Sequence, residues 1–217
     1  MIGLWSAVGL FAVVLAGLVL YTFKVMRKIG TPTRGDRIDP GGRPNAALLV
    51  IDVQEDFTRS KAANAFEPGS RDAAIADINQ SIASARAAGT GVVFIKHVFR
   101  DKLAILLMKM VAKGVGTPGR EGLRIDPALE TGDAPVFEKS VGDAFSSTTF
   151  EDWLATRNVG RLTLVGLDSC HCVQLTAKGA LSRGYQVEIR ETGTLTATPQ
   201  KWGPLKRELG DAGAVFS

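Results

Sequence analysis

The pattern of apolar and polar positions divides the chain into three parts. Residues 1–23 carry no charged side chain, and this length matches the roughly 20 residues that a helix needs to cross a bilayer. Residues 24–44 are rich in glycine, proline and charge, which is typical of a flexible linker. From residue 45 to residue 217, short apolar runs alternate with helical patterns, as in an α/β domain.

The apolar runs of this third part have the length of strands. Residues 46–51 are continuously apolar, which indicates a strand buried on both faces of a parallel sheet. A helix is expected to begin near Ser70, a good N-cap, and to end near Gly89. The other expected strands are 91–99, 134–139, 161–167 and 185–191, and the other expected helices are 148–158, 172–183 and 200–209. This alternation predicts a three-layer α/β fold with a mostly parallel, doubly wound sheet.

One segment, KLAILLMKMVAK at residues 102–113, is almost entirely apolar between its lysines. It is too short to span a bilayer. One interpretation is a helix buried in the core or in an oligomer interface. The other is a lid or a membrane-contacting helix near the active site.

The N-terminal run is predicted to be an uncleaved anchor, so that one transmembrane helix precedes the α/β domain. Trp5 and Tyr21 near its ends are typical of the aromatic residues at membrane interfaces. Basic residues follow the run instead of preceding it, and no small-residue cleavage site is present, so a signal peptide is disfavoured.

Charge gives the orientation of this predicted anchor. The chain has a formal net charge of +4, and five basic residues against one acidic residue between positions 24 and 37 account for it. Positive charge directly after a span predicts a single-pass protein with its main domain on the cytoplasmic side. The basic patch therefore indicates a membrane surface, and no nucleic-acid partner is expected.

Reactive side chains follow three of the expected strands, and ligands bind at the carboxyl ends of strands in such sheets. Asp52 ends the first, Lys139 ends the third, and the fourth leads into a loop carrying Cys172. Cys172 precedes an expected helix, whose free N–H groups favour a thiolate and can form an oxyanion hole. A buried, inert cysteine is the alternative that composition alone favours.

Three separated segments carry a resemblance to a known family. They are LLVIDVQEDF (48–57), VFEKSVGDAFSSTTFEDWL (136–154) and LTLVGLDSCHCVQLTAKGALSRGYQV (162–187). In this order they resemble the isochorismatase-like cysteine hydrolases, which include nicotinamidases and N-carbamoylsarcosine amidase. The resemblance covers about residues 44–195, and the whole hydrolase domain is expected to be residues 45–217.

The resemblance implies a role for each matching residue. Cys172 is the expected nucleophile, Asp52 the carboxylate that accepts its proton, and Lys139 the cation that stabilises the thiolate and orients Asp52. The backbone amides of Asp168 and Cys172 match the oxyanion hole, and the family's cis peptide bond falls at Leu167–Asp168. The implied reaction is hydrolysis of an amide or ureido C–N bond of a small molecule through a thioester.

The resemblance is incomplete in the region where nicotinamidases bind a metal. No histidine lies between Phe57 and Val92, so we expect neither a metal nor a cofactor, and nicotinamide becomes an unfavoured substrate. The substrate pocket is expected to include Phe57, His97 and His171. His97 either hydrogen-bonds the substrate or completes the core, and His171 faces the pocket mouth or a neighbouring subunit. The remaining walls are expected from residues 57–70 and 99–122.

Two other functions stay open. In the first, Cys170 and Cys172 form a thiol redox pair, although a spacing of two residues strains a disulfide; Cys170 otherwise only lines the turn. In the second, the chain is a non-catalytic, membrane-tethered scaffold of the same fold. Family members commonly assemble, so we expect a homo-oligomer.

Overall fold

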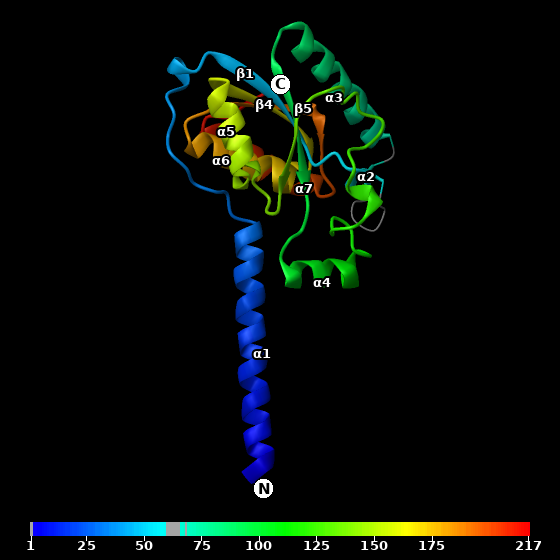
Figure 1. The fold of residues 1–217 in the computed structure, drawn as a ribbon, viewed down its shortest axis with the longest axis vertical. Helices are drawn as coiled ribbons and strands as arrows, with labels where there is room; N and C mark the ends of the chain where they lie inside the picture. The colour runs from blue at the N-terminus through cyan, green and yellow to red at the C-terminus, as the bar shows by residue number, and fades with distance from the viewer. Residues whose placement is uncertain (1, 60–65, 68) are drawn as a thin grey trace.

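The structure, a computed structural model, describes residues 2–59, 66, 67 and 69–217, with side chains from residue 15 onward within these ranges. A long N-terminal helix projects from a domain built on a central sheet (Figure 1). The helices are α1 (Ile2–Ile29), α2 (Glu55–Thr58), α3 (Ser70–Ala87), α4 (Lys102–Val111), α5 (Thr148–Thr156), α6 (Gln174–Ser182) and α7 (Pro199–Asp211).

The sheet has six strands, all parallel, in the order β3-β2-β1-β4-β5-β6. The predicted parallel sheet and its five strands are confirmed, and the short sixth strand was not predicted. The strands are β1 (Asn45–Ile51), β2 (Gly91–His97), β3 (Val136–Lys139), β4 (Val159–Leu167), β5 (Gln186–Leu195) and β6 (Val215–Phe216).

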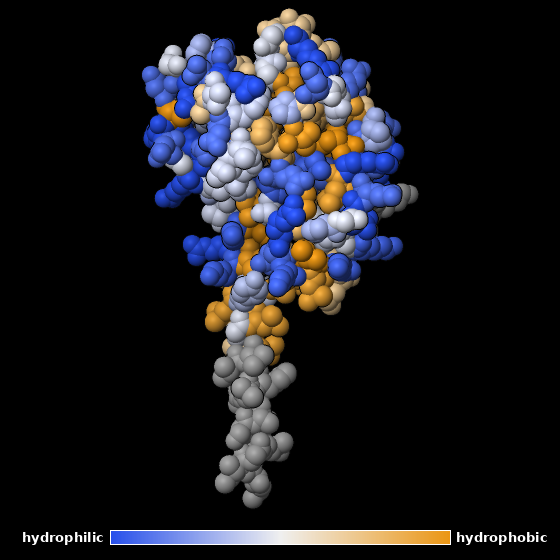
Figure 2. All heavy atoms as spheres, viewed as in Figure 1, coloured by the Kyte–Doolittle hydropathy of each residue, from blue (hydrophilic) through white to orange (hydrophobic). Residues whose placement is uncertain are grey.

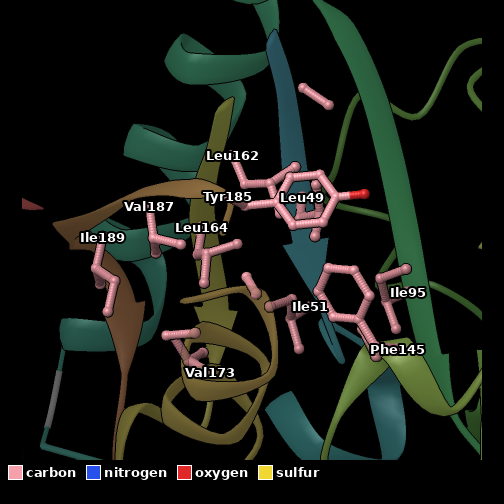
Figure 3. Packing of buried hydrophobic residues seen from close by; sticks show 14 of the residues in the cluster. Leu49, Ile51, Ile95, Phe145, Leu162, Leu164, Val173, Tyr185, Val187 and Ile189 are labelled. Carbon is pink, nitrogen blue, oxygen red and sulfur yellow. The ribbon is translucent and has the colours of Figure 1, made fainter. Parts of the chain in front are cut away.

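Each face of the sheet has its own apolar core, because successive side chains of a strand point to opposite faces. Leu48 and Val50 of β1 pack with the buried isoleucines of α3. Leu49 and Ile51 pack on the other face, against residues of α5, α6 and α7. Figure 3 shows part of this second core, where β1 and β4 side chains lie beside Phe145 and Val173. The three predicted layers are therefore present.

The strand order reverses between β1 and β4, since β2 and β3 extend the sheet on one side and β5 and β6 on the other. Connections leave in opposite directions at such a switch point, and the crevice between them is where open α/β sheets bind ligands. Gly166 lets the two strands approach there. Its φ is +110°, and a Cβ atom at this position would lie 2.1 Å from the Ile51 carbonyl oxygen.

The helix α1 runs on to Ile29, past the predicted end of the anchor at residue 23. Among helices whose residues the structure describes, none combines the length and the hydropathy needed to cross a membrane. The first part of the predicted anchor, residues 1–14, lies outside the described side chains.

The predicted linker lies along the domain and is hydrogen-bonded to it. The Thr33 backbone N–H and hydroxyl both donate to Asp143 Oδ2 at 2.7 Å. Ile38 N donates to the Arg183 carbonyl oxygen at 2.8 Å, and Arg183 Nη1 donates to the Thr33 carbonyl oxygen at 3.1 Å. These bonds fix the end of α1 next to the domain.

The apolar segment at residues 102–113 forms α4, but it is not a core helix. Ala104 is its only buried residue, whereas Leu106, Met110 and Val111 are 53%, 73% and 74% exposed. The interpretation as a core helix is therefore wrong. The helix lies at the lower end of the domain, beside α1 (Figure 1).

Candidate active site

Three segments that are distant in sequence meet at the carboxyl ends of the strands. Asp52 follows β1 directly and has a left-handed backbone with φ of 55°, which aspartate tolerates better than most residues. Lys139 is the last residue of β3. Cys172 lies in the helical turn Ser169–Val173, between β4 and α6.

The structure brings these three predicted residues into contact through the Lys139 ammonium. Lys139 Nζ donates to Asp52 Oδ2 at 2.8 Å and to Cys172 Sγ at 3.2 Å. A third bond goes to the Val141 carbonyl oxygen at 3.2 Å. The side chains of Lys139 and Asp52 are 0% and 4% exposed, so this ion pair is removed from water. Its attraction is therefore stronger than that of an exposed pair.

His97 also contacts Lys139, and this contact defines its protonation. Lys139 Nζ lies 3.0 Å from His97 Nδ1. Because an ammonium only donates, Nδ1 accepts and the ring proton resides on Nε2. Burial, and then the charge of Lys139, lower the pKa of His97 well below its ordinary value. The ring is therefore neutral at physiological pH.

The other ring nitrogen of His97, Nε2, is buried and unpaired among the described residues. His97 lines the main cavity. Phe57 and Phe99 meet the ring edge-on, with centroids 6.2 and 4.5 Å away. A buried N–H without a partner is unfavourable, so a bound molecule that accepts from Nε2 would be stabilised.

Gln54 holds His97 in place and was missed by the sequence analysis. Its Oε1 accepts from the His97 backbone N–H at 2.6 Å, and its Nε2 donates to the His97 carbonyl oxygen at 3.2 Å. Gln54 is fully buried. The available signal was its position two residues after Asp52 in the first family-like segment.

The charges of the cluster favour a resting thiol at Cys172. Burial, and then the Asp52 carboxylate, raise the pKa of the Cys172 thiol far above its ordinary value, although Lys139 acts in the opposite direction. Burial raises the pKa of Asp52 against the effect of Lys139. Burial lowers the pKa of the Lys139 ammonium, but Asp52 and Cys172 raise it by more, so the net direction is upward. These directions favour a thiol over a thiolate at rest, whereas the helix terminus was expected to favour a thiolate.

A metal ion does not fit the donor atoms at this position. Asp52, His97 and Cys172 offer ligand atoms that all lie within 4.8 Å of one another. The Lys139 ammonium, however, already contacts one atom of each residue. A divalent cation bound to the same three atoms would have this ammonium against it, which is strongly unfavourable in a buried site.

The cluster lies at the base of a cavity of about 400 Å³, a size typical of sites for small ligands. All three predicted pocket residues, Phe57, His97 and His171, line it. The predicted wall at 99–122 is present, whereas residues 60–65 and 68 of the other wall lie outside the described residues. The end of α1 forms an unpredicted wall. The lining residues are Ile29, Gly30, Asp52, Phe57, His97, Phe99, Met108, Val111, Ala112, Val115, Gly142, Leu167, Asp168, His171, Cys172 and Leu175.

The turn that carries Cys172 is held by the side chain of Asp168. Its Oδ1 accepts from Cys170 N at 2.7 Å, and its Oδ2 accepts from Ala197 N at 2.9 Å. The Leu167–Asp168 peptide bond is cis, at the position that the family resemblance gave.

Cys170 is buried and lies outside the cavity lining. Its sulfur donates to the Thr198 carbonyl oxygen at 3.5 Å. Both cysteines are free thiols, and no contact between the two sulfurs supports a redox pair within the part of the chain that the structure describes.

A parallel α/β sheet with a half-buried cysteine, a buried carboxylate and a buried lysine at its switch point has the functional groups of a nucleophilic hydrolase. The family model of the isochorismatase domain matches residues 46–215. The chain therefore belongs to the isochorismatase family of hydrolases.

Individual relatives are more distant. The chain is 31% identical to a streptothricin hydrolase of Streptomyces noursei over 148 residues, which cover 68% of this chain and 53% of that protein. It is 29% identical to the nicotinamidase of Escherichia coli (strain K12) over 111 residues, which cover 44% and 52%. The chain thus spans about half the length of these two relatives.

Solved structures share the fold. An N-carbamoylsarcosine amidase from Thermoplasma acidophilum superposes with a TM-score of 0.67 at 18% identity, covering 80% of this chain and 95% of that chain. This likeness shows a shared fold.

Proposed function

We propose that this chain is a cysteine-dependent hydrolase that cleaves an amide or ureido C–N bond of a small molecule through a thioester. One observation carries the proposal: a buried ammonium, that of Lys139, bonds both the Asp52 carboxylate and the Cys172 sulfur at the base of the cavity. A nucleophile beside its base is the arrangement that covalent catalysis requires.

Acylation begins from the neutral thiol. Asp52 Oδ1 is buried and accepts no hydrogen bond from other described groups, so it is available for the thiol proton. As Asp52 takes this proton, the sulfur forms a bond to the substrate carbonyl carbon. The backbone N–H groups of Asp168 and Cys172 are proposed to stabilise the oxyanion. The C–N bond then breaks, and Asp52 returns its proton to the leaving amine or ammonia.

Deacylation uses the same groups in reverse. Asp52 accepts a proton from water, and the hydroxide oxygen bonds to the thioester carbon. The C–S bond breaks, the acid product leaves, and the proton returns to the sulfur of Cys172. Lys139 stays protonated throughout, because its raised pKa favours the charged form, and it stabilises each negative charge that develops on the sulfur.

His97 is proposed to orient the substrate. His97 lines the cavity, and its buried Nε2–H has no partner among the described residues. A carbonyl oxygen or a ureido oxygen of the substrate is a suitable acceptor. His171 lines the same cavity and is proposed to contact the part of the substrate nearest the opening.

We also propose that α1 anchors the protein in a membrane as a single-pass helix, with the hydrolase domain in the cytoplasm. Leu18, Leu20 and Phe23 are more than half exposed, and basic residues follow directly. Extraction of cell membranes with alkaline carbonate tests this proposal. Release of the full chain into the carbonate wash would contradict it.

We propose that the protein forms a homo-oligomer, binds a small amide or ureido substrate and binds no nucleic acid. Light scattering of the detergent-solubilised chain tests the oligomer, and a single protomer mass would contradict it.

The decisive experiment compares the two cysteines. Ammonia release is measured from a panel of small primary amides and ureido compounds with the full chain, with Cys172→Ala and with Cys170→Ala. We expect Cys172→Ala to abolish turnover and Cys170→Ala to retain it. Intact mass spectrometry during turnover should show the chain with an added acyl group on Cys172. Turnover that persists in Cys172→Ala would overturn the mechanism.

A further inference from the structure

The described lining of the cavity that contains Cys172 has few charged side chains. Its only charged lining residues among those described are Asp52 and Asp168, and both are acidic. Asp52 is paired with Lys139, and Asp168 accepts two backbone hydrogen bonds. No lysine or arginine lines the described cavity.

The buried lysine cannot supply the missing positive charge to a substrate. Lys139 already bonds Asp52, Val141 and Cys172 and contacts His97. A substrate carboxylate or phosphate in the cavity would therefore be desolvated without a cation of its own, which is unfavourable. The described part of the cavity lining therefore disfavours anionic substrates.

The rest of the lining is apolar and belongs to three parts of the fold. The end of α1 contributes Ile29, the segment of α4 and its following loop contributes Met108, Val111 and Val115, and α6 contributes Leu175. Phe57 and Phe99 frame His97 on the same side. Such walls bind hydrocarbon.

The apolar lining continues out of the cavity onto the surface. Val111 lines the cavity and is nevertheless 74% exposed, so it lies at the opening. Beyond it, Met110 on α4 and Phe23 on α1 are 73% and 68% exposed. Figure 2 shows apolar residues gathered at this lower end of the domain, over α4 and the described end of α1.

The two helices that border the opening are fixed to each other. Tyr21 of α1 donates from its hydroxyl to Asp101 Oδ2 at 3.0 Å. Asp101 is also the N-cap of α4, where Oδ1 accepts from Leu103 N and Ala104 N at 2.9 and 3.1 Å. The opening between α1 and α4 is thus a built feature of the fold.

We propose that the substrate is an uncharged amide or ureido compound with an apolar chain, and that the chain leaves the cavity between α1 and α4. This inference rests on the proposed hydrolase function. The C–N group binds at Cys172 with its oxygen facing His97, while the hydrocarbon lies against Met108, Val111 and Val115. The apolar chain can arrive from water or from a lipid bilayer, because the same surface accepts both.

The test uses the full chain in detergent with a series of linear primary amides from acetamide to octanamide. Matched amides that end in a carboxylate form the second series. Each added methylene should raise kcat/KM about fourfold while the chain fills the cavity, since burying one methylene is worth ~0.8 kcal/mol. The carboxylate series should be turned over at least tenfold more slowly at equal length.

A variant at the cavity opening distinguishes binding of the substrate's hydrocarbon chain from the reaction at Cys172. Val111→Lys changes an exposed residue, so the fold should be kept, and it should lower kcat/KM for octanamide about tenfold more than it lowers kcat/KM for acetamide. Val215→Lys, the same change at a residue 62% exposed on β6, is the matched control and should alter neither substrate. Repeating the octanamide assay in phosphatidylcholine vesicles distinguishes delivery from lipid from delivery from water.

The outcomes are distinct. Turnover of acetamide that depends on Cys172, with no gain along the series or with equal rates for the carboxylate series, would overturn this inference and leave the hydrolase function standing. No turnover of any amide in either series would overturn the hydrolase function and this inference with it.

Discussion

The Lys139 ammonium donates a hydrogen bond to the Cys172 sulfur at 3.2 Å, although the two residues are 33 positions apart in the sequence. The same ammonium bonds Asp52. The base and the nucleophile are therefore held by one buried cation. The thiol is nevertheless protonated at rest, because burial and Asp52 raise its pKa more than Lys139 lowers it. Removing either charged partner should change the thiol in a specific direction.

The first prediction concerns Asp52→Asn. The carboxylate raises the pKa of Cys172 and Lys139 lowers it, so the substitution should increase the thiolate fraction at neutral pH. Alkylation of Cys172 by iodoacetamide should become faster, whereas amide turnover should fall at least 100-fold because the proton acceptor is lost. A Cys170→Ser background leaves one thiol to follow by mass spectrometry. Slower alkylation in Asp52→Asn would contradict this reading of the charges.

The second prediction concerns the acid side of the pH profile. Turnover needs Asp52 ionised, and burial raises its pKa above the ordinary 3.8. The value of kcat/KM should therefore begin to fall, as the pH is lowered, at a pH above 3.8. Burial and Lys139 lower the pKa of His97 well below its ordinary value, so His97→Gln should leave this limb in place. A limb that disappears in His97→Gln would assign it to the histidine instead.

The third prediction tests His97 as a donor. His97→Phe keeps an aromatic ring between Phe57 and Phe99 but removes both the Nε2 donor and the acceptor for Lys139. We expect kcat/KM to fall about 10- to 100-fold, because a hydrogen bond to a charged group contributes ~1.5–3 kcal/mol. His97→Gln keeps a donor and should recover part of the loss. Equal activity of the Phe variant and the wild type would exclude this role.

The fourth prediction concerns metals. Because Lys139 occupies the centre of the Asp52, His97 and Cys172 donors, removing metals with EDTA should leave turnover unchanged. Elemental analysis of the treated protein is the control. Added Zn²⁺ should not activate the enzyme. Loss of activity in EDTA that zinc restores would show that the ammonium gives way to a metal.

The fifth prediction concerns the approach of β1 and β4. Gly166→Ala places a Cβ atom 2.1 Å from the Ile51 carbonyl oxygen at a φ of +110°, so the backbone must shift. We expect the free energy of unfolding to fall by about 3 kcal/mol or more, and turnover to fall with it because Asp52 follows Ile51. Gly203→Ala on α7 meets no atom within 4 Å and should stabilise slightly. Urea unfolding of both variants measures the difference.

Local pattern was sufficient for the sheet and for the identity of the reacting groups. The continuous apolar run before Asp52 and the apolar runs that follow predict buried parallel strands, because only such strands are apolar on both faces. The family-like segments marked Asp52, Lys139 and Cys172, since a nucleophile turn needs particular residues at fixed spacing.

Helix α4 shows the limit of this reasoning. Its apolar composition suggests burial, yet none of its large apolar side chains is buried and Leu106, Met110 and Val111 are exposed.

The amino-acid order alone predicts which residues form strands, which side chains can react, and that an apolar helix precedes the domain, because these depend on neighbours along the chain. Three features arise only when the chain is folded. They are the protonated state of Cys172, the unpartnered Nε2 of His97, and the placement of α1 and α4 at the cavity opening. Each depends on burial and on distances between groups far apart in sequence, and such electrostatic and packing effects exist only in the assembled structure.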